Sequence, residues 1–115
     1  MSDSKDNGGE RVVLDRLFAV IESRRSADPE KSYVAKLLRK GPAKLAQKVG
    51  EEAVETAIAA TLGDRKEIVA ESADLLFHLL VLWAGTGVKA EDVWAELARR
   101  EGISGVDEKK SRAKG

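Results

Sequence analysis

Two matched pairs of carboxylates constrain how the middle of this chain can fold. Segments 43–62 and 65–84 both have helical periodicity and meet at Gly63. Each carries two acids at i, i+3 spacing, which places both side chains on one face of a helix. The pairs are Glu52 with Glu55 and Glu71 with Asp74. The inner acid of each pair lies eight residues from Gly63 and the outer acid eleven. An antiparallel hairpin would therefore bring the pairs face to face.

Converging acids need a reason to be together. Acids at this spacing often serve only solubility on a surface helix, but here apolar neighbours place part of the acidic face near the core, where charges need partners. Ligand sets made only of oxygen suit magnesium, manganese or calcium, and magnesium is the usual partner of phosphates. We therefore expect a magnesium site, with manganese as an alternative, whose ligands are Glu52, Glu55, Glu71 and Asp74.

Two neighbouring residues bear on this metal site. Glu51 is adjacent to the first pair and could join the metal shell, with a solvated role as the alternative. A diiron carboxylate bundle would instead need Glu-x-x-His motifs. The only histidine, His78, has no glutamate three residues before it. The sequence therefore argues against a diiron centre.

Composition excludes several function classes. A chain of 115 residues forms one domain, and 20 basic against 20 acidic residues create no global field for nucleic acid or membrane surfaces. The absence of cysteine removes disulfides and thiolate sites and fits a reducing cytoplasm. The start is polar, and the longest nearly apolar run, 75–84, is shorter than the roughly 18 residues of a membrane span. We expect a cytoplasmic protein with a small-molecule partner.

Turn and cap residues divide the chain into an all-α domain of about five helices, residues 11–102, between a disordered segment 1–10 and a flexible tail 103–115. Asp28 with Pro29, and then Ser32, provide capping signals before a short helix that Gly41 stops. The predicted helices begin near Arg11, cover Tyr33–Leu38, and span about 43–62, 65–84 and 90–100.

The segment 65–84 also indicates how the chain assembles. Its second half is apolar around the whole circumference, which is typical of a helix covered on every side. Five helices can hardly supply that cover, so we expect a homodimer that completes a four-helix-bundle-like assembly around the hairpin. The alternative is a monomer in which the short helices provide the cover. Gly50, inside a helix, suggests a tight backbone contact. Trp83 and Trp94 are expected to pack in apolar stripes rather than stack on a base.

Several sequence blocks carry a resemblance to a known family. KVGEEAVE at 48–55 and ESADLL at 71–76 resemble the EExxE and ExxD signature of the all-α nucleotide pyrophosphohydrolases, the MazG-like superfamily. Three blocks are closer still to the phosphoribosyl-ATP pyrophosphohydrolase family of histidine biosynthesis: SYVAKLL at 32–38, AQKVGEE at 46–52 and DLLFHLLVL at 74–82. The similarity spans about 14–100, with Phe77 where tyrosine is expected as often.

The resemblance implies a nucleotide-binding hydrolase. It would convert phosphoribosyl-ATP to phosphoribosyl-AMP and pyrophosphate, the second step of histidine biosynthesis, with metal-assisted attack of water. The catalytic residues it implies are Glu51, Glu52, Glu55, Glu71 and Asp74, with Glu55 or Glu51 orienting the water. The candidates for substrate binding are Lys48, Lys36, Arg39 and His78. Their alternatives are solvated charges for the basic residues and a satisfied core residue for the histidine.

Two rival functions remain open. A house-cleaning nucleoside triphosphate pyrophosphohydrolase would use the same four acids, although the blocks at 32–38 and 47–48 argue against it. A non-catalytic helical adaptor would bind no divalent metal. The C-terminal segment 103–112 resembles an SGxxEKxxR ending of some family members. It could close over a bound polyphosphate or remain a solvated tail.

Overall fold

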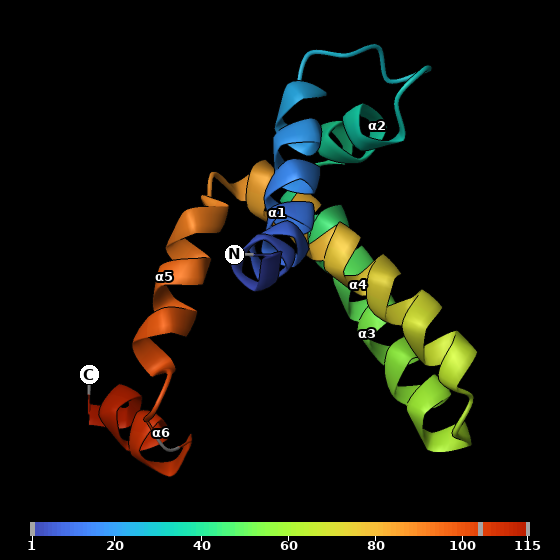
Figure 1. The fold of residues 1–115 in the computed structure, drawn as a ribbon. Coiled ribbons are helices and arrows are strands. Elements are labelled where there is room, and N and C mark those ends of the chain that lie inside the picture. The colour runs from blue at the N-terminus through green and yellow to red at the C-terminus, as the bar shows by residue number, and fades with distance from the viewer. Residues whose placement is uncertain (1, 104, 115) are drawn as a thin grey trace.

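The chain is helical along nearly all of its length. The computed structural model describes the backbone of residues 2–103 and 105–114 and the side chains of 13–103, 105–107 and 109–112. Over these residues it has six helices and no strand, which confirms the all-α prediction. The helices are α1 Ser2–Ser23, α2 Tyr33–Lys40, α3 Pro42–Leu62, α4 Arg65–Thr86, α5 Ala90–Arg100 and α6 Gly105–Lys114 (Figure 1).

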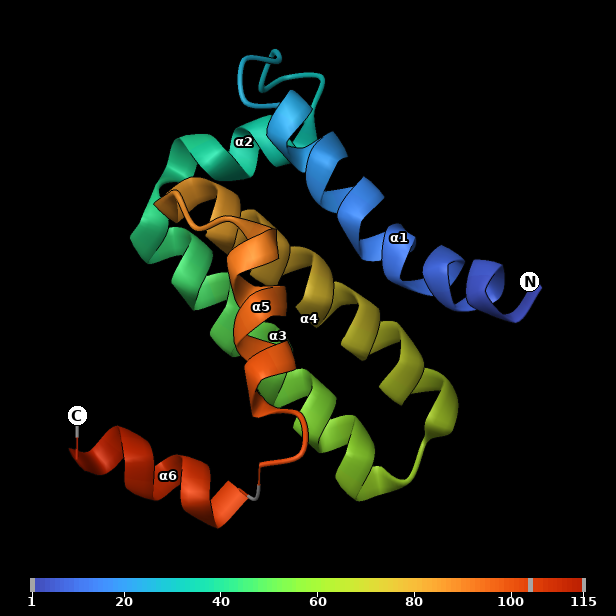
Figure 2. The ribbon, with the colours of Figure 1, turned by 60° about the vertical axis from the view of Figure 1, so that its left-hand side comes forward.

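The two ends differ from the sequence-based expectation. Helix α1 begins at Ser2 rather than near Arg11. The tail expected to be flexible contains α6, which stands away from the other helices in Figure 2. Once a helix has nucleated, each added residue closes a further hydrogen bond, so polar residues continue it at little cost. Ser104, part of the SGxxEKxxR ending, lies outside the described residues, and the domain bounds 11–102 stay a prediction.

Helices α3 and α4 form the antiparallel hairpin that the acid spacing predicts (Figures 1 and 2). Gly63 ends α3 in the left-handed region with φ of 71°, and its N–H donates to the Ala60 carbonyl at 3.1 Å. Only glycine adopts this conformation without steric cost. Asp64 then caps α4, because its side chain accepts from the Glu67 N–H at 3.2 Å. The shortness of this connection sets the register of the two acid pairs.

The predicted caps around α2 are also present. The Asp28 side chain accepts from the Glu30 N–H at 2.9 Å, and the Ser32 side chain accepts from the Ala35 N–H at 3.1 Å. Gly41, with φ of 90°, separates α2 from α3, whose first residue is Pro42. These contacts position α2 against the open end of the hairpin, where α3 begins and α4 ends.

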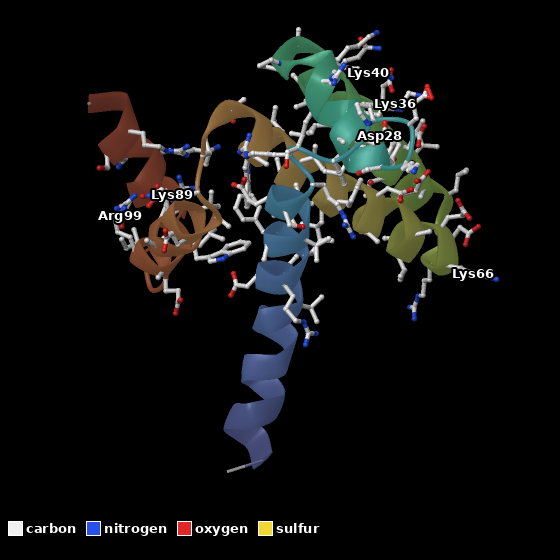
Figure 3. The ribbon with its side chains drawn as sticks, turned by 90° about the horizontal axis from the view of Figure 1, so that it is seen from above. Asp28, Lys36, Lys40, Lys66, Lys89 and Arg99 are labelled. Carbon is white, nitrogen blue, oxygen red and sulfur yellow. The ribbon has the colours of Figure 1, made fainter. Side chains whose placement is uncertain are left out.

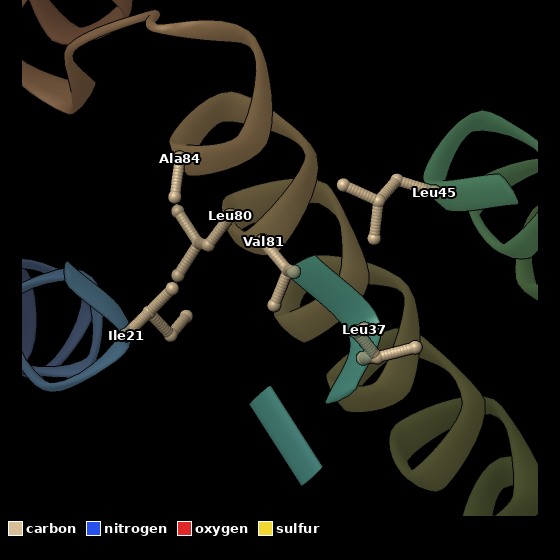
Figure 4. Close-up of a cluster of buried hydrophobic side chains, with 6 residues drawn as sticks. All are labelled: Ile21, Leu37, Leu45, Leu80, Val81 and Ala84. Atoms are coloured by element: carbon tan, nitrogen blue, oxygen red, sulfur yellow. The ribbon is translucent and has the colours of Figure 1, made fainter. Parts of the chain in front are cut away.

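The core lies where α1, α2 and α3 meet the C-terminal half of α4. The Arg25 guanidinium donates to the Ala84 carbonyl and ties the end of α1 to α4. Figure 4 shows the buried cluster, which comprises Ile21, Leu37, Leu45, Leu80, Val81 and Ala84. The close backbone approach is at Gly85, where an added Cβ would lie 2.5 Å from Leu45 Cδ1. The expectation of a tight contact at Gly50 is wrong within this chain, since nothing lies within 4 Å there.

The tryptophans pack as expected. Trp83 and Trp94 meet edge to face with ring centroids 5.6 Å apart. The indole N–H of Trp94 donates to Asp15 Oδ1 at 2.7 Å. These contacts attach α5 to α4 and α1.

Helix α4 is only partly covered within the chain. Among the described residues it is the one helix long and apolar enough to span a membrane by length and composition, with mean hydropathy 1.5 over 18 residues. The short apolar run 75–84 is therefore not enough, by this criterion, to argue against a membrane span. Of that window, 22% is buried. The helix nevertheless packs against α1, α2 and α3, as the core helix of a helical bundle does.

Candidate active site

Three of the four predicted metal ligands come together between α3 and α4. One carboxylate oxygen from each of Glu52, Glu55 and Glu71 lies within 4.8 Å of the others. Glu52 and Glu71 are half-buried between the helices, and Glu55 is exposed at the edge. The i, i+3 spacing on α3 and the tight Gly63 turn together produce this acid cluster.

Asp74 lies at the margin of the acid cluster. It is exposed and is not among the residues whose oxygens fall within 4.8 Å of one another. Its charge nevertheless raises the pKa of both Glu52 and Glu71, so it is a near neighbour. A carboxylate at this position can reach a cation held by the other three through a change of rotamer.

The cluster shifts the titration of its own members. Partial burial, the charge of Glu55 and a hydrogen bond with Glu55 raise the pKa of Glu71 to about 7, with further contributions from Glu52 and Asp74. Burial, followed by the charges of Glu55 and Asp74, also raises the pKa of Glu52. Like charges at short range disfavour ionisation in this way. The metal-free cluster is therefore electrostatically unfavourable near neutral pH.

One buried oxygen of the cluster lacks a partner. Within the described part of the chain, Glu52 Oε2 is the buried side-chain oxygen or nitrogen that makes no hydrogen bond. Such an atom costs free energy unless a ligand satisfies it. An oxygen-only donor set with an unsatisfied buried oxygen fits a hard divalent cation.

Lys48 and Glu51 flank the cluster on α3. Lys48 Nζ lies 4.0 Å from Glu51 Oε1, and the charge of Lys48 partly offsets the rise that burial and the neighbouring acids cause in the pKa of Glu52. Gln47 Nε2 donates to Glu51 Oε2 at 2.9 Å. Glu51 is thus held by two neighbours on its own helix. The structure places Lys48 beside the acids, as a phosphate-binding residue would need to be.

The other basic candidates lie earlier in the chain, on α2. Lys36 and Arg39 are exposed, and Figure 3 shows Lys36 and Lys40 projecting from this helix. A hollow of about 200 Å³ joins α2 to α3 and is lined by Lys40, Lys44, Gln47, Lys48 and Glu51. Lys36 lines a different hollow, and among the side chains that the structure describes Arg39 makes no hydrogen bond or salt bridge with the acid cluster. Their role in substrate binding stays a prediction.

His78 is buried, with both ring nitrogens engaged. Nδ1 lies 2.8 Å from the Asp74 carbonyl oxygen, so it donates, and Nε2 lies 3.2 Å from the Tyr33 hydroxyl, from which a neutral ring accepts. This is the satisfied core histidine that the sequence left as the alternative. Its ring links α2 to the acid-bearing helix, and direct contact with substrate stays a prediction.

A small hollow opens on the exposed side of the acid cluster. It measures about 170 Å³ and is lined by Glu55, Ile58, Ala59, Leu62, Asp64, Glu67 and Glu71. Two of its apolar residues are unusually open, with Ile58 53% and Leu62 77% exposed. The acids therefore face solvent through an apolar rim.

Two side chains near the site were not singled out by sequence reasoning. Tyr33 bonds to His78, and Gln47 positions Glu51. Both lie in blocks that carry the family resemblance, which was the available signal. Their contacts depend on how α2 crosses the hairpin and on rotamers, neither of which a single sequence specifies.

Comparison with known proteins agrees with this site. The family model for phosphoribosyl-ATP pyrophosphohydrolase matches residues 14–101. The chain is 62% identical over 102 residues to phosphoribosyl-ATP pyrophosphatase of Paramagnetospirillum magneticum, covering 89% of this chain and 94% of that one. It is 59% identical over 101 residues to the protein of the same name from Azospirillum brasilense, covering 88% and 91%. The chain therefore belongs to the phosphoribosyl-ATP pyrophosphohydrolase family.

Proposed function

We propose that the acid cluster of α3 and α4 holds a divalent cation, magnesium or alternatively manganese, and is the catalytic centre of this enzyme. The chain hydrolyses phosphoribosyl-ATP to phosphoribosyl-AMP and pyrophosphate, the second step of histidine biosynthesis, in keeping with its family and relatives. Glu52, Glu55 and Glu71 are the inner ligands and Asp74 completes the set.

The observation that carries the proposal is the unsatisfied buried oxygen of Glu52 within a group of three converging carboxylates. A structural role would give these acids basic partners. Instead, burial and mutual repulsion raise the pKa of Glu52 and Glu71. The free energy lost in the metal-free state is recovered when a cation binds.

The chain's own residues divide the remaining tasks. A divalent cation in the cluster supplies positive charge against phosphate oxygens and acidifies water. Glu55, exposed at the edge of the cluster, or Glu51, held by Gln47, orients the attacking water and accepts its proton. Lys48 contacts the phosphate chain from one side of Glu52, where its charge already acts. The attack proceeds without a covalent enzyme intermediate.

One assay tests the reaction and separates it from both rivals. The purified chain is incubated with phosphoribosyl-ATP or a panel of nucleoside triphosphates, with phosphate and pyrophosphate measured separately. We expect pyrophosphate from phosphoribosyl-ATP, and only with a divalent metal present. Preference for ordinary or damaged triphosphates would favour the house-cleaning alternative. Failure to bind any divalent metal would favour the adaptor.

We further propose that the active species is a homodimer in the cytoplasm, without a membrane or nucleic-acid partner. Apolar side chains lie open along the hairpin, on α3 and on α4 from its first turns to its middle. They are Val54 59%, Ile58 53%, Leu62 77%, Val69 70% and Leu76 46% exposed. An apolar surface of this extent on a small chain is typical of an interface. A second copy would supply the cover that α4 lacks.

Sedimentation equilibrium tests the dimer. Ile58→Glu places a charge on the open face and should shift the chain toward monomer while leaving it helical. Leu97→Glu, at a side chain 53% exposed on α5, is the matched control and should leave assembly unchanged. Leu80 is unsuitable for this test, because it is 1% exposed within its own chain. A folded, active monomer of the wild-type chain at micromolar concentration would refute the dimer.

A further inference from the structure

We propose that the ring of Tyr33 is the surface on which the purine base of the substrate stacks. The nature of the substrate rests on the proposed function, whereas the stacking surface rests on the structure. Tyr33 is the first residue of α2 and is 52% exposed. It is therefore an open aromatic ring near α4, and it does not belong to the buried hydrophobic cluster.

The Tyr33 ring is held in a fixed orientation despite its exposure. One face lies along Phe77, with centroids 6.1 Å apart and planes inclined by 14°. The edge of His78 meets it at 6.2 Å and 89°. Its hydroxyl bonds to His78 Nε2 at 3.2 Å. A surface ring immobilised before binding loses little conformational entropy when a ligand stacks on it.

Tyr33 borders a hollow large enough for a nucleotide. This hollow measures about 600 Å³ and is lined by Pro29, Glu30, Lys31, Ser32, Tyr33 and Lys36. Phe77 does not line it, although Phe77 and Tyr33 together border a neighbouring hollow of about 550 Å³. The larger hollow therefore has Tyr33 but not Phe77 in its wall. Its volume falls in the range typical of ligand sites, and bases of any identity stack on exposed aromatic rings.

Charge around the hollow favours a phosphorylated ligand. Lys31, Lys36 and Glu30 all line it, so cations are in excess. Neither lysine forms a salt bridge with any side chain that the structure describes. Both ammonium groups can therefore make charge-assisted hydrogen bonds to phosphate oxygens.

The ring is also linked to the acid cluster through one side chain. His78 contacts the Tyr33 hydroxyl on one side and the Asp74 carbonyl on the other. A single imidazole thus connects the Tyr33 hydroxyl to the backbone of Asp74, the residue at the margin of the acid cluster.

Fluorine NMR tests the contact directly, because Tyr33 is the only tyrosine in the chain. Labelling with 3-fluorotyrosine gives one resonance, which is followed while AMP is added to the magnesium-loaded protein. We expect a saturable shift with AMP and a several-fold smaller one with pyrophosphate, which lacks a base. An unmoved resonance at millimolar AMP would overturn the proposal.

Kinetics separate this inference from the proposed function. Tyr33→Leu should raise the KM for phosphoribosyl-ATP several-fold with little change in kcat, whereas Tyr33→Phe, which keeps the ring, should stay close to wild type. Unchanged KM in Tyr33→Leu, with hydrolysis intact, would sink the stacking surface alone. A resonance that responds to AMP in a chain that does not hydrolyse phosphoribosyl-ATP would sink the proposed function alone.

Discussion

The two halves of α4 differ in composition and do different work, because the charged residues of the helix all lie in its N-terminal half. In the C-terminal half, Leu80, Val81 and Ala84 are at most 1% exposed, against α1, α2 and α3. In the N-terminal half, Val69 is 70% exposed and Glu71 enters the acid cluster, and Leu76 at the middle of the helix is 46% exposed. The C-terminal half stabilises the fold. The N-terminal half carries the chemistry and is stabilised less by its own chain.

This difference shows how a small domain tolerates an unfavourable site. The acids repel one another, and one buried oxygen lacks a partner. A site of this kind lowers stability until its ligand binds, since a ligand that binds only the folded state stabilises it. The packed half of α4 supplies the stability that makes the acidic half possible.

The largest expected effect is in the packed half. Leu80→Ala should lower the free energy of unfolding by about 2–5 kcal/mol, because it leaves a cavity among side chains that cannot collapse into it. Leu76→Ala on the same helix is the control and should cost much less. Denaturant titration of both variants measures the difference. Equal losses would mean that Leu76 is covered in solution, which would break the contrast and favour burial by a second copy.

The next effect is in the acidic half. Glu55→Gln and Asp74→Asn should each lower turnover by at least about a hundredfold, or about 2.7 kcal/mol in activation free energy. The helical content should be unchanged, and relief of repulsion should hold or raise the melting temperature of the metal-free protein. Glu91→Gln, at an exposed acid on α5, is the control. Near-normal turnover would remove these acids from the site, and unfolding would make them structural.

A smaller effect should appear in the pH dependence of the metal-free protein. The pKa of Glu71 is raised from 4.5 to about 7, so the folded state binds more protons than the unfolded state between these values. Stability must then fall as pH rises from 4.5 to 7 and level off above. Glu71→Gln should flatten this decline in urea titrations at stepped pH. An unchanged slope in the variant would assign the decline to other groups.

Glu96 on α5 provides a contrast of opposite sign. Hydrogen bonds from Arg99 and Arg100 lower its pKa from 4.5 to about 2. Its contribution to stability is present above pH 4.5 and is lost as pH falls toward 2. Glu96→Gln should therefore alter the acid limb of the same curve and leave the window from 4.5 to 7 unchanged.

The smallest expected effect concerns the C-terminal segment. Truncation after Gly102 removes α6, with the basic groups that could close over a bound polyphosphate. A closing segment predicts a several-fold higher KM, with fold and metal affinity unchanged. Unaltered kinetics would leave α6 as a solvated end.

Much of the fold could be predicted from the residues that start and stop helices. Ser32, Pro42, Gly63 and Asp64 start or stop helices through their own side-chain and backbone chemistry, and α2 to α5 begin and end near the predicted residues. The facing acids followed from equal spacing about Gly63. Local signals of this kind do not depend on tertiary context.

Features that depend on packing were not predictable in the same way. The close approach at Gly85 rather than Gly50 depends on where the Leu45 side chain lies. Asp74 falls outside the tightest group of carboxylate oxygens, and residue spacing does not specify side-chain placement at this level. The Tyr33–His78 bond depends on how α2 crosses the hairpin. Composition likewise did not indicate that α1 begins as early as Ser2, since helix propagation needs no apolar stripe.

Calorimetric titration of magnesium into the metal-free chain at pH 7 tests the central claim most directly, namely that the acids of α3 and α4 form a cation site. Because the pKa of Glu71 is about 7 without metal, bound magnesium should displace its proton. We predict saturable binding with proton release, seen as a dependence of the heat on the buffer's ionisation enthalpy, and loss of both in Glu71→Gln. Absence of binding, or equal binding by the variant, would contradict the account.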